Sequence, residues 1–138
     1  MRYPTQTVYG TPPYDISSFS PPGVDVISHM MIARFHGGPS LITYVWFYSM
    51  VHNHGPWDYK QGKPQYDNFG NFHFGAVGTA AGIPDGVLLR AAGIAQIIAG
   101  TSDPVEFAQY HSVDSYGDDP VDQTWIRAGI DYAKRCGF

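Results

Sequence analysis

The stretch that decides the fold class is Pro84–Gly100, with the sequence PDGVLLRAAGIAQIIAG. Its apolar residues recur every three or four positions, which is the spacing of one buried face of an α-helix. Pro84 and Asp85 suit a first helical turn, and Gly100 suits a C-terminal stop. The pattern predicts a helix over this whole range, with a buried face formed by Val87, Ala91, Ile94, Ala95 and Ile98.

Further segments carry helical signals, so the sequence predicts a mainly α fold of about five helices around one core. These segments are residues 25–35, 39–52, 104–110 and 120–135. Residues 39–52 are apolar nearly all round, which favours the central buried helix, although their β-branched and aromatic content also allows a strand. The first and last helices are expected to bury Val24, Ile27, Met31 and Phe35, and Val121, Trp125, Ala128 and Tyr132, respectively.

The rest of the chain divides into a proline-rich lead-in or linker, residues 1–23, and a long irregular segment, residues 53–75. A chain of 138 residues has the size of one domain, which we place at residues 24–138. Residues 53–75 are dense in Gly, Asn, Asp and Pro, which favours a loop, and long loops in compact domains are typically functional. A small β-hairpin within this loop is an alternative. Gly78 and Gly82 follow at helical spacing, which predicts close backbone packing in the core.

The composition limits the classes of function. Charged residues make up 14 % and the formal net charge is −4, so a broad basic surface for nucleic acid is excluded, although a nuclease needs only a local patch. Cys136 is the single cysteine, which excludes a multi-cysteine zinc site. The apolar run Leu41–Val51 has about half of the ~20 residues that span a bilayer, so we expect no transmembrane insertion. No glycine-rich phosphate loop or serine nucleophile elbow occurs, and we expect no cofactor.

The irregular segment contains the residues most suited to catalysis. His73 lies between Phe72 and Phe74, and such partial desolvation keeps an imidazole neutral, as suits a general base. We expect Asp58 or Asp67 to orient this base. The alternative is a half-buried histidine that only packs.

Other residues of this segment could bind a substrate or a metal. A substrate-binding role is predicted for Trp57, Tyr59, Lys60, Asn71, His54 and Asp118. Aromatic faces suit sugars or bases, a lysine suits a phosphate, and an amide can donate to a developing negative charge. His52, His54 and Asp58 are a weak alternative as metal ligands, since loop histidines also make ordinary polar contacts.

Structural readings of the same residues stay open. Trp57 could anchor a turn, and Asp118 could be a turn residue. Arg90, the one basic residue within the helix predicted over Pro84–Gly100, is expected to pair with an acid.

Four stretches carry a family resemblance. They are Asn53–Lys60 (NHGPWDYK), Tyr66–Gly75 (YDNFGNFHFG), Leu88–Gly93 (LLRAAG) and Tyr116–Gln123 (YGDDPVDQ). Together they resemble the polymorphic toxin type 44 domain over roughly residues 25–136. The resemblance implies a toxin module of bacterial competition, carried by a secretion-system protein into a target bacterium and neutralised by a cognate immunity protein.

The reaction is not fixed by this resemblance. We expect an enzyme that hydrolyses the bacterial cell envelope in the periplasm, most plausibly peptidoglycan, with His73, Asp58 and Asp67 as its catalytic residues. Residues 66–75 are also faintly similar to the glycine-rich hairpin of phage-type lysozymes, in which a threonine usually takes the place of His73. The alternative is a metal-independent ribonuclease with His73 as base, a second histidine as acid and Lys60 on the phosphate. A non-enzymatic membrane-perturbing role for Leu41–Val51 also stays open.

Overall fold

The computed structural model describes residues 12–38, 40–60, 63–90 and 120–138 of the chain. All of its regular elements are helical, which confirms the prediction of a mainly α fold, and these ranges contain no β-strand. The elements are α2 (Val26–Phe35), α3 (Leu41–Val51), a short 3₁₀ turn η1 (Pro64–Tyr66), α4 (Asp67–Ala80), α5 (Asp85–Leu88) and α8 (Pro120–Arg135). Within the described ranges, no helix combines the length and apolar character needed to cross a bilayer.

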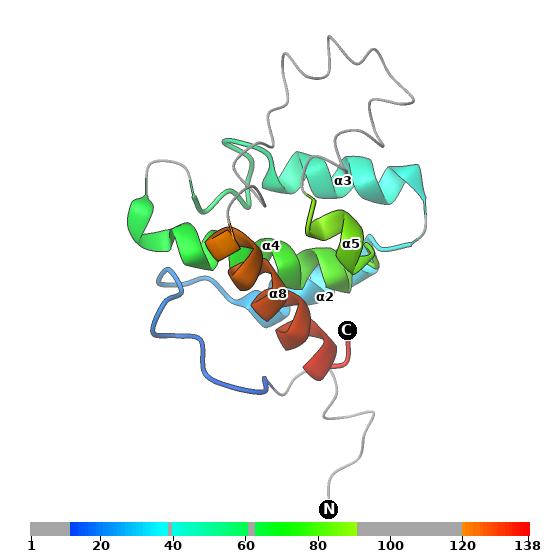
Figure 1. Cartoon of the computed structure of the whole chain (residues 1–138). Helices are drawn as coiled ribbons and strands as arrows, with labels where there is room; N and C mark the ends of the chain where they lie inside the picture. The colour runs from blue at the N-terminus through cyan, green and yellow to red at the C-terminus, as the bar shows by residue number, and fades with distance from the viewer. Residues whose placement is uncertain (1–11, 39, 61–62, 91–119) are drawn as a thin grey trace, which may run out of the picture.

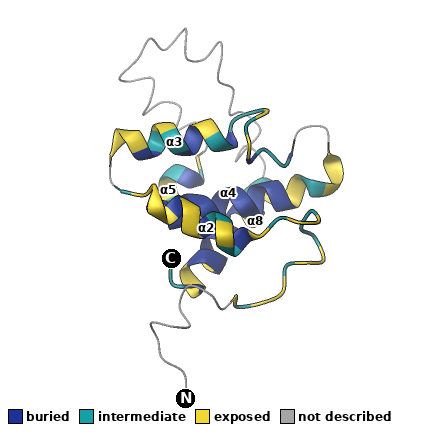
Figure 2. Ribbon diagram, turned by 180° about the vertical axis from the view of Figure 1, so that it is seen from behind, coloured by how far each residue is buried: buried dark blue, intermediate teal, exposed yellow. Residues whose placement is uncertain are grey.

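Helix α4 occupies the centre of the fold. Figures 1 and 2 show it between α8 on one side and α2 on the other. Every residue from Phe69 to Ala80 is buried, and α4 makes its most extensive helix contacts with α8 and α2. A helix buried all round needs partners on every face, and α3 supplies a third one, with the Phe47 ring 5.3 Å from the Phe74 ring.

Glycines set how closely α4 and α8 approach each other. A Cβ atom at Gly75 would collide with the Ile126 carbonyl of α8, and one at Gly129 would collide with the Phe72 carbonyl of α4. The two helix backbones therefore touch where each lacks a side chain. Gly78 is closely packed, but against side chains rather than against backbone as predicted, because a Cβ there would meet the side chains of Leu88 and Phe47. Gly82 instead ends the segment, with a φ of 86°.

The prediction of a loop up to residue 75 is wrong from Asp67 onward. Residues 67–80 form α4 although they include Gly70, Gly75 and Gly78. Each helical glycine costs about 1 kcal/mol relative to alanine, so the local sequence disfavours this helix. Close contacts with Lys60, Ile126 and Leu88 occupy the space that the missing side chains leave. Tertiary packing thus overrides local preference, and no hairpin occurs among the described parts of this segment.

The buried faces differ from those predicted for the outer helices. Helix α2 buries Val26, Met30 and Ala33, whereas Met31 and Phe35 are exposed. Helix α3 is peripheral rather than central, since Leu41, Ile42 and Val45 are exposed. Helix α8 buries Tyr132 as expected, with Ile126, Gly129, Ile130 and Ala133, but Val121 is exposed. The small residues Ala33 and Gly129 face the core because the helices pack closely.

The described part of the N-terminal segment, residues 12–23, packs on this core. Its Phe19 ring lies 5.3 Å from the Phe72 ring of α4 and 5.1 Å from that of Trp125 in α8.

The helix predicted over Pro84–Gly100 is present as α5 up to Leu88, and residues 91–119, with the helix predicted over 104–110, lie outside the described residues. Cys136, close to the C-terminal residue, is buried.

The contact between α4 and α8 predicts a large cost for adding one methyl group. Gly129→Ala should lower the free energy of unfolding by about 1–3 kcal/mol, because the new Cβ overlaps backbone that cannot yield. Gly86→Ala is the matched control, since a Cβ there meets open space. Urea denaturation measures both variants. Equal stabilities for the two variants would contradict the close contact.

Candidate active site

Two histidines from different helices meet beside the core. The Nδ1 atom of His29, in α2, lies 2.8 Å from the Nε2 atom of His73, in α4. This distance is that of a hydrogen bond, and its donor depends on which tautomer each ring adopts. His73 is fully buried, whereas His29 is half-buried. A substrate could therefore reach the pair only through His29.

Aromatic rings surround this histidine pair. The His29 ring stacks on that of Trp57, with centroids 4.6 Å apart and an interplanar angle of 15°. The Tyr59 ring lies 4.9 Å from the His73 ring, and the Phe69 ring lies 5.6 Å from it. Rings on several sides hold both imidazoles in one orientation and keep water away from His73.

Burial also sets the charge of the pair. Desolvation lowers the pKa of His73 well below its ordinary value, and the neighbouring His29 lowers it further. Desolvation likewise lowers the pKa of His29, against a smaller opposing effect from the Asp25 carboxylate. Both rings are thus neutral at pH 7. The second ring nitrogen of His73, Nδ1, is buried without a hydrogen-bond partner among the described residues.

The predicted carboxylate partners do not contact His73. The Asp58 carboxylate instead accepts the backbone N–H groups of His54, at 2.7 Å, and Lys60, at 3.0 Å. These bonds organise the turn before Lys60, where His54 has a φ of 67°. Asp67 is an exposed residue of the first turn of α4. His29 takes the position next to His73 for which the sequence suggested an acid.

Three further polar residues form a separate buried network on the α8 side of α4. Lys60 Nζ donates to Asn71 Oδ1 at 3.2 Å, and Asn71 Nδ2 donates to Asp122 Oδ1 at 3.0 Å. The Asp122 carboxylate also lies 3.7 Å from Lys60 Nζ. This network joins the turn after α3 to α4 and α8, and it satisfies charges that burial would otherwise penalise. The contacts place Lys60 and Asn71 inside the fold rather than at an open substrate site.

The remaining predicted site residues are scattered. Trp57 is buried against His29 and Tyr59 is half-buried, so Trp57 supports the histidine pair rather than offering an open face. Over the described ranges, no group of three metal-ligating side chains is assembled, and His52, His54 and Asp58 do not form one. Arg90 is exposed, and Asp118 lies outside the described residues.

The sequence reasoning missed His29. It is a single histidine within an amphipathic helix, and its neighbours in sequence carry no catalytic pattern. Only the packing of α2 on α4, over 44 intervening positions, brings it to His73. Asp122 lies in the first turn of α8, where an acidic residue is common, and nothing in its local sequence indicates its contact with Lys60.

Comparison with known proteins identifies a class of bacterial toxins. A family model described as Bacterial toxin 44 (Ntox44) matches residues 59–135, which is more than half of the chain. The chain belongs to this toxin family. The matched range contains His73 and the Lys60, Asn71 and Asp122 network, whereas His29 precedes it. Neither the curated proteins nor the solved structures give a significant match.

Burial of a neutral His73 predicts an acid-sensitive fold. Below the ordinary histidine pKa of about 6.5, the unfolded chain binds a proton at this residue whereas the folded chain does not. The free energy of unfolding should therefore fall with decreasing pH, by about 1.4 kcal/mol per pH unit from this residue. Urea denaturation between about pH 5 and pH 8 measures the slope.

A pair of variants isolates the contribution of His73. In His73→Gln, the slope below about pH 6.5 should flatten, since this side chain does not titrate. The control His36→Gln removes an exposed histidine at the end of α2 and should keep the steeper slope. The same slope in the wild type and in both variants would contradict a neutral buried His73.

Proposed function

We propose that this toxin domain is a ribonuclease that uses His29 as its general base and His73 as the residue that positions it. The observation that carries this proposal is the buried contact between the two imidazoles. It supplies a neutral base with a fixed orientation, which is what acid–base catalysis near pH 7 requires.

The hydrogen bond within the pair assigns a role to each nitrogen. When Nδ1 of His29 donates to Nε2 of His73, the Nε2 atom of His29 carries the lone pair that can accept a proton. His73 then acts as the ring that holds this tautomer, since it is fully buried and cannot itself touch a polymer. The stacked Trp57 ring fixes the plane of His29.

RNA is the substrate class that such a base serves most directly, because its own 2′-hydroxyl is the nucleophile. His29 takes the 2′-hydroxyl proton, the 2′-oxygen attacks phosphorus, and the bond to the 5′-oxygen breaks, with that oxygen protonated by water. Tyr59 stays protonated because burial raises its pKa. Its ring lies 6.4 Å from His29, so its hydroxyl is a candidate donor to a phosphate oxygen.

Hydrolysis of peptidoglycan, which the sequence favoured, is the second candidate. The net charge of −4 supports it, because a negative protein repels RNA. Glycoside hydrolysis commonly uses two facing carboxylates. Among the described residues, Asp58 is engaged in a turn and Asp67 is exposed at a helix start, so the geometry favours the histidine chemistry.

Membership of a toxin family also supports proposals about the biological setting. We infer that the domain is delivered into a target bacterium by a secretion-system carrier and that a cognate immunity protein protects the producing cell. A ribonuclease would act in the cytoplasm of the target, whereas a peptidoglycan hydrolase would act in its periplasm.

Removing the proposed base should abolish toxicity. His29→Ala should reduce killing at least ~100-fold, since a positioned general base contributes about 10²–10⁴ in rate. His73→Gln should have a smaller effect, because the base itself remains. Colony counts after induced expression measure both, with circular dichroism to show that each variant folds. His36→Ala is the matched control and should stay toxic. A folded His29→Ala variant with full toxicity would remove this residue from the mechanism.

The compartment of action separates the two candidate substrates. Expression in the bacterial cytoplasm should stop growth with loss of intact RNA, and purified domain should cleave RNA at a rate that His29→Ala abolishes. Expression with an export signal should be less harmful. Toxicity that appears only on export, with cell lysis and intact RNA, would overturn the ribonuclease proposal in favour of the envelope.

A further inference from the structure

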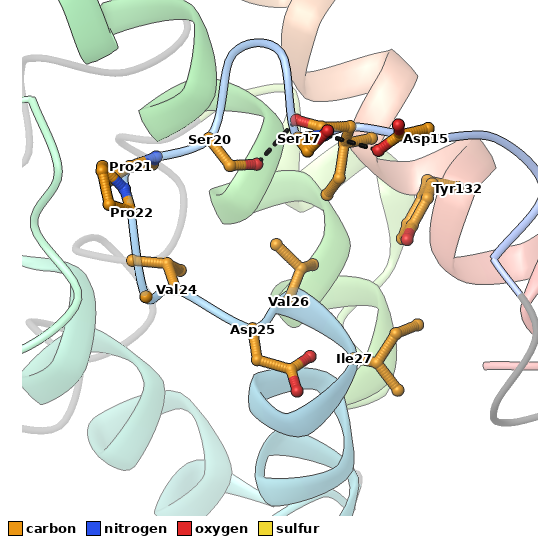
Figure 3. Close-up of a pocket in the computed structure, with 12 residues that line it drawn as sticks. Asp15, Ser17, Ser20, Pro21, Pro22, Val24, Asp25, Val26, Ile27 and Tyr132 are labelled. Carbon is orange, nitrogen blue, oxygen red and sulfur yellow. Dashed lines mark hydrogen bonds between the residues drawn. The ribbon is translucent and has the colours of Figure 1, made fainter.

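A hollow of about 410 Å³ lies between the segment that precedes α2 and the C-terminal helix. Residues 15–17 and 20–25, the first turn of α2 and Tyr132 of α8 line it, and Figure 3 shows these residues. Its volume is that of a small-molecule site. None of the residues of the histidine pair or of its aromatic surround lines it, so it is distinct from the proposed active site.

Two carboxylates at this hollow are held in the ionised form. Hydrogen bonds from Ser17 lower the pKa of Asp15, and hydrogen bonds from Ser28 lower the pKa of Asp25. The Asp15 carboxylate accepts the Ser17 backbone N–H at 2.9 Å, and the Asp25 carboxylate caps α2 by accepting that of Ser28 at 3.1 Å. These bonds fix the direction of both carboxylates while leaving each its negative charge.

The Tyr132 hydroxyl faces the same space. The residue is only 2 % exposed, and its ring packs edge-on against those of Tyr14 and Phe72. Figure 3 shows its hydroxyl directed into the hollow, and no described residue forms a hydrogen bond with it. Burial raises its pKa, with smaller contributions from charges that include Asp25 and Asp15. The hydroxyl therefore stays protonated, close to both carboxylates.

Apolar side chains complete the lining. Ile16, Val24 and Ile27 contribute aliphatic surface, and Pro21 and Pro22 close one side. An ammonium or guanidinium head on a methylene stem matches such a lining, because the stem packs on apolar atoms while the head meets the charges. A purely apolar ligand would leave two negative charges uncompensated and the Tyr132 hydroxyl without a hydrogen-bond partner.

We propose that this hollow binds an ammonium or guanidinium group carried on a short aliphatic chain, with Asp15 and Asp25 as its anionic partners and the Tyr132 hydroxyl as a further acceptor. The group can belong to a free alkylamine or to a lysine or arginine side chain of a protein. Both sources present the same chemistry to the hollow.

Calorimetric titration of the purified domain at low salt tests this proposal with two probes. Agmatine, which carries a guanidinium and an ammonium group on a butyl chain, represents the free ligand, and the capped tripeptide Gly-Arg-Gly represents a protein side chain. Butylurea is the neutral control. We expect saturable binding of at least one cationic probe, with a dissociation constant below about 50 mM, and no binding of butylurea.

Variants assign the binding to this hollow. Asparagine can still accept the backbone N–H groups of Ser17 and Ser28 through its amide oxygen and so cap α2. Asp15→Asn with Asp25→Asn therefore removes both negative charges while these backbone hydrogen bonds can persist, and it should weaken binding at least ~10-fold. Tyr132→Phe should weaken it ~3-fold or more. The control Asp85→Asn removes an exposed carboxylate of α5 elsewhere and should leave binding unchanged. No saturable binding of either probe, or equal binding by the double asparagine variant, would overturn the proposal.

Discussion

Burial of α4 on every side is the constraint on which the rest of the structure depends. A helix in that position cannot carry large side chains on all faces, because α8, α3 and the turn at Lys60 approach its backbone. Glycines at 70, 75 and 78 provide the room, and Gly129 provides it on α8. Two of the polar residues that α4 buries, Asn71 and His73, find partners within the fold. Asn71 meets Lys60 and Asp122, and His73 meets His29.

The polar network at Asn71 and the histidine pair at His73 lie on different sides of α4 and have different roles. The Lys60, Asn71 and Asp122 network compensates buried charge and ties three chain segments together, which is a structural task. The histidine pair has one fully buried ring and one that is half-buried, an asymmetry that fits the roles we propose for His73 as the positioning residue and His29 as the general base. The network thus holds α4 in the place where His73 can fix His29.

The sequence predicted the elements better than their packing. Apolar spacing, prolines at helix starts and basic residues at helix ends predict helices close to residues 26–35, 41–51 and 120–135. The structure contains these three helices. Residues 67–80 were expected to be largely loop because Gly and Asn disfavour helices locally, and only contacts from distant segments reverse that preference. His73 was found through its aromatic neighbours in sequence. His29 could not be found in this way, because its partner His73 lies on a different helix and 44 positions away in the chain.

Nitrogen NMR of the ¹⁵N-labelled histidine rings can show whether the histidine pair exists in solution. We predict that His29 and His73 keep the ring shifts of neutral imidazoles well below the ordinary histidine pKa of about 6.5, with a scalar coupling across the hydrogen bond between Nδ1 of His29 and Nε2 of His73. Ordinary titration of both rings near about pH 6.5, without that coupling, would show that the pair does not exist in solution.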